Sequence, residues 1–153
     1  EAIANVPEAL LPEIAKIQSE PLKEGPDFEI EDRLAVGVAP QMKFDKAELK
    51  VKAGAGVELA FTNNDPMPMM HNLVLVKPGS RIEIVTAAAT MGAAGMANSF
   101  VPESDKVLAA TPLVLTGNTY KLYFKAPTIP GKYEYICTYP GHGLTMWGTL
   151  VVE

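Results

Sequence analysis

From about residue 27 to the C-terminus, hydrophobic residues alternate with other residues in short runs, the pattern of half-buried β-strands. Turn signals such as Asn63-Asn64-Asp65-Pro66 and Pro130-Gly131 separate these runs. The alternating positions are Leu34, Val36 and Val38; Leu49 and Val51; Val57, Leu59 and Phe61; His71 to Val76; Tyr120, Leu122 and Phe124; Tyr133 and Tyr135; and Thr149 and Val151. Because the strands do not alternate with helices, we predict an all-β fold, an antiparallel Greek-key β-sandwich.

Two segments depart from this pattern. Residues 1–28 contain four prolines, and an apolar set with helical spacing predicts a short helix over about residues 12 to 19. We therefore predict an N-terminal helical or extended arm, or a linker, over 1–28 and one domain over 29–153. Thr86 to Asn98 contains six alanines and no strand alternation. This segment predicts a short helical flap, with an ordinary crossover between the sheets as the alternative.

Composition limits the classes of function. The chain has 153 residues and a formal net charge of -5, with Lys and Arg scattered singly, which argues against nucleic-acid binding. No apolar run is long enough for a membrane helix, so we expect a soluble chain. The first residue is Glu1, which is compatible with a processed secreted protein or with a domain excised from a longer one. The single cysteine, Cys137, excludes an internal disulfide.

The strongest chemical signal is the loop Cys137-Thr138-Tyr139-Pro140-Gly141-His142-Gly143-Leu144-Thr145-Met146, between two predicted strands. It carries a thiol, an imidazole and a thioether within ten residues. The bend at Pro140-Gly141 allows all three side chains to face one point. Taken singly, a Cys, His or Met is more often an ordinary core or solvated residue; their joint placement predicts a metal site.

The ligand types favour copper over other ions. Thiolate and thioether are soft ligands, and a set of two His and one Cys with a weak axial Met is the blue-copper arrangement. The one other histidine, His71, opens an apolar run and is the remaining candidate ligand. Zinc accepts Cys and His but rarely Met, and the loop has no acid to act as a catalytic base. We predict one copper ion bound by His71, Cys137, His142 and Met146.

At these residues the sequence resembles the cupredoxins, and among them the azurin and auracyanin group. The resemblance covers about residues 30 to 153 and rests on the spacing of Cys137, His142 and Met146. It extends to four further segments: Gln41 to Asp45, His71-Asn72, Val107 to Thr111 and Gly148 to Val151. It implies a cupredoxin-like fold and a type I blue-copper site. In such proteins the residues matching Asn72 and Thr138 tie the two ligand loops together by hydrogen bonds and tune the metal.

The sequence departs from azurins in two respects. Azurins have a glycine before the first histidine whose carbonyl approaches the copper, whereas this chain has Met70. We therefore expect at most a weak fifth contact from the Met70 carbonyl. Azurins also carry a disulfide, which the single cysteine cannot form.

These residues predict a carrier of single electrons rather than an enzyme, because both histidines are used and none remains for a second copper centre. We expect the ring edge of His142 to reach the surface beside Pro140 and Leu144 and to act as an electron port. Met42, Met67 and Met96 are weaker candidates for that patch, with ordinary core as the alternative. A copper storage or delivery protein is a competing interpretation, since Met67, Met69 and Met70 form a Met-rich turn.

Partners and location follow only from the resemblance. It implies a periplasmic or cell-surface location and a redox partner such as a c-type cytochrome or a quinol-oxidising complex. We expect a monomer with no membrane span and no nucleic-acid partner. Residues 1–28 could tether the domain to a membrane anchor or to a larger redox enzyme, making it an electron relay.

Overall fold

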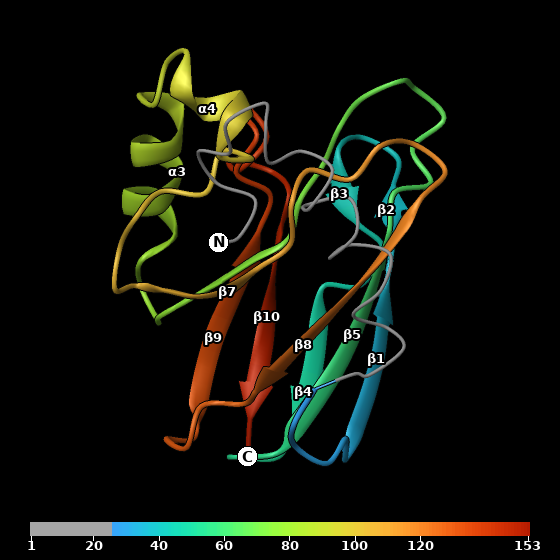
Figure 1. Ribbon diagram of the computed structural model, residues 1–153, viewed down its shortest axis with the longest axis vertical. Coiled ribbons are helices and arrows are strands. Elements are labelled where there is room, and N and C mark those ends of the chain that lie inside the picture. Colours follow the sequence, from blue (N-terminus) through green and yellow to red (C-terminus); the bar gives the residue numbers. More distant parts are fainter. Residues whose placement is uncertain (1–25) are drawn as a thin grey trace.

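The computed structural model describes residues 26–153 as two β-sheets packed face to face (Figure 1). The three-stranded sheet has the order β1 (Asp32–Val36), β5 (Gly56–Thr62) and β8 (Thr119–Lys125). The five-stranded sheet has the order β4 (Glu48–Val51), β10 (Trp147–Val152), β9 (Gly131–Ile136), β6 (Val74–Val76) and β7 (Val107–Ala110). A hairpin pairs β2 (Val38–Ala39) with β3 (Lys43–Phe44). The predicted β-sandwich is confirmed, while the helix predicted near residues 12 to 19 lies outside the described residues.

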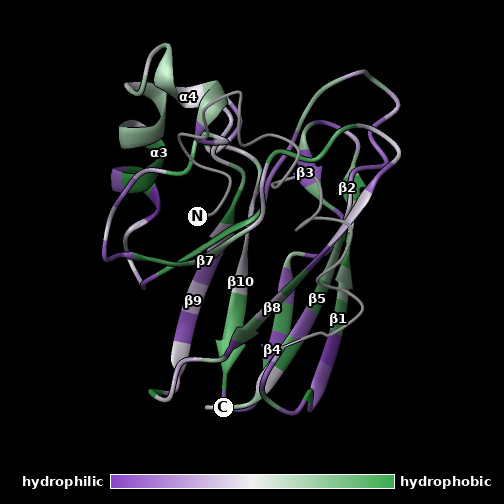
Figure 2. Cartoon of the chain, in the orientation of Figure 1, coloured by the Kyte–Doolittle hydropathy of each residue, from purple (hydrophilic) through white to green (hydrophobic). Residues whose placement is uncertain are grey.

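Hydrophobic and hydrophilic residues alternate along the strands (Figure 2), so that one face of each sheet packs in the core. On β5, Val57, Leu59 and Phe61 are buried between the sheets, whereas the residues between them are partly exposed. Burying each such side chain stabilises the fold by about 1.5–3 kcal/mol before entropy is counted. Phe44 packs edge-on against Phe61 and Tyr135, with ring centroids 5.9 and 5.2 Å away, and so joins the hairpin to both sheets.

The prediction of an antiparallel sandwich is wrong for two strand pairs. β1 pairs with β5 in parallel, and β4 pairs with β10 in parallel. The other pairs among the described strands are antiparallel. Alternation reports which side chains face the core but carries no information on strand direction, so the sequence pattern could not distinguish these pairings.

Two predicted strands are shorter than their apolar runs. The run from Leu34 to Val38 breaks at Gly37, whose N–H donates to Asp45 Oδ1 over 2.9 Å instead of to a neighbouring strand. The run from His71 to Val76 is a strand only from Val74, because Leu73 N–H donates to the Thr111 hydroxyl over 3.0 Å. Both interruptions depend on side chains outside the apolar runs, those of Asp45 and Thr111.

The predicted helical flap is confirmed, although it begins earlier than expected. Helix α3 (Arg81–Ala89) starts five positions before Thr86, and α4 (Ala94–Ala97) follows it. Figure 1 shows both helices outside the five-stranded sheet. Ile84 forms a small separate cluster there with Val74, Val76 and Ile136. Within residues 26–153, no helix has the length and apolar character needed to cross a membrane.

Candidate metal centre

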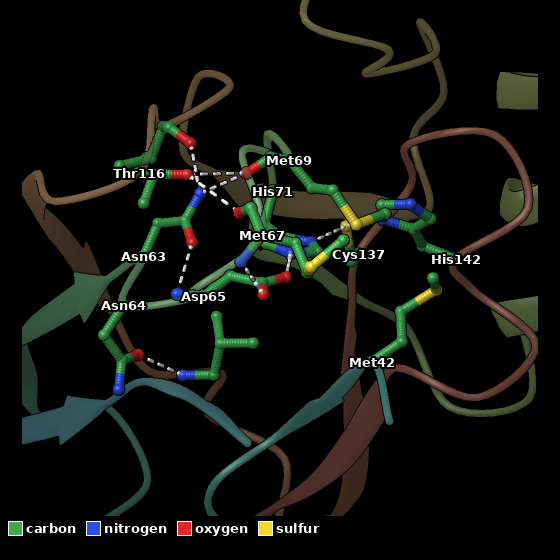
Figure 3. A network of polar contacts seen from close by, with 12 residues as sticks. Met42, Asn63, Asn64, Asp65, Met67, Met69, His71, Thr116, Cys137 and His142 are labelled. Atoms are coloured by element: carbon green, nitrogen blue, oxygen red, sulfur yellow. Dashed lines mark hydrogen bonds and ion pairs between the residues drawn. The ribbon is translucent and has the colours of Figure 1, made fainter. Parts of the chain in front are cut away.

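Three potential ligand side chains converge at one end of the sandwich. Cys137 Sγ lies 3.7 Å from Nδ1 of His71 and 3.6 Å from Nδ1 of His142. The three ligand atoms all lie within 4.8 Å of one another (Figure 3). Cys137 and His71 are fully buried, and His142 is only 4% exposed. The fold thus brings His71 and Cys137, which are 66 positions apart in the chain, together in one buried site.

The loop from Cys137 to Met146 is held by its own backbone. Cys137 N–H donates to the Met146 carbonyl over 3.0 Å, which closes the loop at its base. The His142 N–H donates to the Tyr139 carbonyl over 2.9 Å, and the Met146 N–H donates to the His142 carbonyl over 2.8 Å. Gly141, with φ of +89°, allows the chain to reverse immediately before His142. Met146 is fully buried on the same loop as Cys137 and His142.

His71 is positioned by a backbone bridge and a braced turn. It exchanges two backbone hydrogen bonds with Val114, of 3.3 and 2.7 Å. The side-chain amide of Asn63 donates to the carbonyls of Met69 and Val114, each over 2.8 Å. The turn that leads to His71 is therefore fixed by a fully buried side chain at its start.

The sequence interpretation missed Asp65, which contacts His71 directly. Asp65 Oδ2 lies 2.8 Å from Nε2 of His71, on the side of the ring opposite the nitrogen that faces Cys137. The hydrogen bond to His71 lowers the pKa of Asp65 below its ordinary value, against the opposing effect of burial. The only sequence signal was an acid six positions before the histidine, inside a segment interpreted solely as a turn.

Asn72 and Thr138 join the two ligand segments through buried hydrogen bonds. Asn72 Nδ2 donates to the Thr138 hydroxyl oxygen, and Thr138 N–H donates back to Asn72 Oδ1, each over 2.8 Å. Asn72 also donates to the Ser99 carbonyl over 2.9 Å, and the Thr138 hydroxyl donates to the Phe100 carbonyl over 2.6 Å. Ser99 and Phe100 both have φ of 55°, a left-handed conformation that turns their carbonyls toward this pair.

Burial keeps the Cys137 thiol and the His142 imidazole uncharged near neutral pH. It raises the pKa of the Cys137 thiol to about 11. It also lowers the pKa of His142 to about 4, with a further contribution from the nearby His71. A neutral imidazole can act as a ligand directly, whereas the thiol must lose its proton when it binds a metal.

The predicted port residues lie around His142, and the methionines are distributed more widely. Pro140 and Leu144 are exposed on either side of His142, whose ring packs against Tyr139 at a centroid distance of 4.8 Å. Met67 and Met96 are exposed, and Met42 is partly buried with its side chain directed toward His142 in Figure 3. Within residues 26–153, the Met70 carbonyl makes no hydrogen bond, and its approach to a metal stays a prediction.

The flap contacts the ligand loop at Gly143. Arg81, the first residue of α3, donates from Nη1 to the Gly143 carbonyl over 3.0 Å. Its guanidinium lies 4.4 Å from the ring centroid of Trp147, the residue after Met146. Val85 packs so tightly on Gly143 that any Cβ there would collide with it. No pattern in the sequence indicates that the flap contacts this loop.

The donor set suits copper. Two imidazole nitrogens and one sulfur converge in a buried site, and a fully buried thioether lies on the same loop. Soft sulfur with imidazole matches copper, whereas calcium and magnesium require oxygen ligands. Three nitrogen and sulfur donors held together before metal binding also limit the movement that loading requires.

Comparison with known proteins agrees with this donor set. Residues 32–153 match the model of a family described as copper binding proteins, plastocyanin/azurin family. Auracyanin-A of Chloroflexus aurantiacus is 39% identical over 113 residues, which cover 74% of this chain and 68% of that protein. Auracyanin-B of the same organism is 38% identical over 122 residues, covering 76% of this chain and 50% of that protein.

A solved structure of auracyanin A, described as a "blue" copper protein from a green thermophilic photosynthetic bacterium, has the same fold. It superposes with a TM-score of 0.72 at 35% identity. The match covers 80% of this chain and all of that one. The resemblance drawn from the ligand loop is therefore confirmed over most of the described residues.

Proposed function

Because this chain belongs to the plastocyanin/azurin family of copper-binding proteins, we propose that it is a type I blue-copper electron carrier. We assign the ligands as His71, Cys137, His142 and Met146. The observation that carries the proposal is the convergence of two imidazole nitrogens and one thiol sulfur within 4.8 Å in a buried site. A bound copper ion would supply the Cu(II)/Cu(I) couple, which carries one electron at a time.

The residues of the site suit a carrier because they are held in place before any metal binds. The Asn72–Thr138 pair ties the two ligand segments together through two 2.8 Å hydrogen bonds. The loop from Cys137 to Met146 is closed by its own backbone. Ligands that stay in one arrangement in both oxidation states need little reorganisation for each electron transfer.

The experiment that tests the assignment is the visible and EPR spectrum after Cu(II) is added to the copper-free protein. We expect an intense blue thiolate band and a reversible one-electron titration. Cys137→Ser should abolish the band, because a hydroxyl cannot replace the thiolate as a donor. A colourless product, or a Cys137→Ser variant with an unchanged spectrum, would refute the assignment.

We further propose that electrons pass through the edge of the His142 ring. Within the described residues, Nε2 of His142 has no protein acceptor and is not among the buried unpaired atoms, so it reaches solvent. The flanking Leu144 is 65% exposed and provides an apolar contact surface. Another redox protein could dock there with a short path to the ligand sulfur.

Leu144→Asp tests this port. The variant should keep the blue spectrum but slow electron self-exchange between oxidised and reduced copies, because facing carboxylates repel one another. Ile129→Asp is the matched control, since Ile129 is 71% exposed and precedes β9, a strand about 20 Å long that ends next to Cys137. Equal self-exchange rates in Leu144→Asp and the native protein would refute the port.

The setting of this chemistry is also a proposal. The family resemblance supports redox-protein partners, such as a c-type cytochrome or a quinol-oxidising complex, and a periplasmic or cell-surface location. A role as a carrier rather than an enzyme rests on the same site, in which both histidines of the chain lie at one centre. Fractionation of the source cells, followed by the blue absorbance, would test the location.

A further inference from the structure

Asp65 makes a two-point contact that fixes its carboxylate beside the site. Its Oδ1 accepts the Met67 backbone N–H over 3.0 Å, and its Oδ2 lies 2.8 Å from Nε2 of His71 (Figure 3). The Asp65 backbone N–H donates to Asn63 Oδ1 over 3.1 Å, and Asn63 is itself anchored to Met69 and Val114. The carboxylate is therefore held by the turn independently of His71.

The charge on this carboxylate determines where the imidazole proton lies. An ionised carboxylate can only accept a hydrogen bond, so a neutral His71 must carry its proton on Nε2. Nδ1 is then unprotonated, and Nδ1 is the atom 3.7 Å from Cys137 Sγ. His71 is fully buried, so neither ring nitrogen is exposed to bulk solvent.

We propose that Asp65 is a positioning residue that orients His71 for metal binding and stabilises Cu(II) relative to Cu(I), a role that rests on the proposed function. A carboxylate that accepts the second N–H of a ligand histidine raises the basicity of that ligand. Its negative charge beside the site also favours the more highly charged metal ion.

The contact is specific to one of the two histidines. His142 has no carboxylate partner among the described residues, and its Nε2 faces solvent instead. Asp65 therefore acts on the deep ligand and leaves the ligand at the surface free to meet a partner. This asymmetry separates the control of potential from the route of the electron.

The test compares three variants of the full chain loaded with copper. Asp65→Asn removes the charge and leaves one acceptor for two donors, Met67 N–H and His71 Nε2–H. We expect the affinity for Cu(II) to fall at least tenfold relative to Cu(I), within the 10–100-fold range typical of such partners. A tenfold change raises the midpoint potential by about 59 mV for a one-electron couple. Asp65→Glu retains the charge and should lie between Asp65→Asn and the native protein.

Asp105→Asn is the control. Asp105 is exposed and does not contact His71, and its substitution removes the same formal charge as Asp65→Asn. Its potential should match that of the native protein. A purely structural role for Asp65 would make the longer Asp65→Glu side chain at least as disruptive as Asp65→Asn, with no ordered change in potential. An unchanged potential in Asp65→Asn with a normal blue band would overturn the proposal and leave the proposed function intact.

A second measurement needs no variant and guards against a misfolded Asp65→Asn. In the diamagnetic Cu(I) form of the native protein, NMR should show a His71 Nε2–H proton that is shifted downfield and exchanges slowly with water. The His142 Nε2–H should exchange quickly. Rapid exchange at both rings would overturn the proposal, whereas the absence of any copper-dependent ring signal would refute the proposed function instead.

Discussion

The two histidines of the site belong to regions of opposite character. His71 lies at the end of a turn fixed by buried side chains, is bridged to Val114 and contacts Asp65 on its outer nitrogen. His142 lies on the exposed loop between β9 and β10, and its outer nitrogen reaches solvent. Both present Nδ1 to the same Cys137 sulfur at nearly equal distances of 3.7 and 3.6 Å.

The difference shows how one site can serve two needs. In the role proposed for Asp65, the rigid, charged environment around His71 would stabilise the geometry of the ligands and set the affinity of the site for each oxidation state. Because the Nε2 edge of His142 reaches solvent, this ligand lies within reach of an external partner. If both histidines had the same environment, the site would be either buried on both sides or accessible on both sides.

Deleting each imidazole in turn tests the contrast between the two histidines most directly. His142→Gly opens a gap at the surface, so added imidazole should enter it and restore the blue spectrum. His71→Gly leaves a cavity sealed by the core and an Asp65 carboxylate without its partner, so added imidazole should fail to restore it. Titration of the blue band with imidazole measures both.

Cys137→Ser is the control for this experiment, because imidazole cannot replace a thiolate and the band should stay absent. Equal recovery of His71→Gly and His142→Gly would contradict the contrast in accessibility. Failure of both would place the His142 ring deeper than its solvent-facing nitrogen indicates.

A second prediction separates the two regions by pH in the copper-free protein. The pKa of His142 is lowered to about 4 by burial, below the ordinary value of 6.5. Between these values the unfolded chain binds a proton that the folded chain does not, so stability is complete above pH 6.5 and falls toward pH 4. The shift corresponds to about 3 kcal/mol of unfolding free energy. Urea denaturation at a series of pH values measures it.

Asp65 contributes in a different window. The pKa of Asp65 is lowered below its ordinary value of 3.8, mainly by the hydrogen bond to His71. The contribution of Asp65 to the free energy of unfolding is therefore present above that pH and lost below it. His142→Gln should therefore flatten the profile between pH 6.5 and 4 and leave the acid limb in place. A profile that is flat in the native protein over that upper range would contradict the burial of His142.

The sequence predicted the His142 region better than the His71 region, for a physical reason. Cys137, His142 and Met146 are joined by a short loop that local backbone hydrogen bonds close, so their spacing alone predicts a shared site. His71 is predicted as a ligand mainly because it is the one histidine of the chain besides His142. Its partner Asp65 lies in a turn, where Asp is common for reasons unrelated to metals.

Long-range contacts explain the remaining gaps in the prediction. The strands could be recognised from alternation, but the parallel direction of β1 with β5 depends on tertiary packing. The left-handed Ser99 and Phe100 are held by carbonyl contacts with Asn72 and Thr138, which are distant in sequence. The early start of α3 at Arg81 places a cation on the ligand loop, a contact that no local pattern encodes.

The smallest predicted effect concerns this brace on the His142 loop. Arg81→Met keeps most of the aliphatic stem but removes the hydrogen bond to the Gly143 carbonyl, the cation over Trp147 and the ion pair with Glu134. We expect the free energy of unfolding to fall by about 1–2 kcal/mol. Because the loss falls on the loop of His142 and Met146, copper should also dissociate faster. Chemical denaturation and copper transfer to a chelator measure the two effects.

Arg33→Met is the matched control, because the Arg33 side chain is 69% exposed and lies 3.7 Å from Glu58 on the neighbouring strand of the three-stranded sheet. Its stability should change by less than about 0.5 kcal/mol, the usual range for exposed ion pairs. If Arg81→Met destabilises the fold without faster copper loss, the flap supports the sandwich only. If Arg81→Met accelerates copper loss, the position of His142 depends on a contact from outside its loop, whereas His71 is held by residues of its own turn.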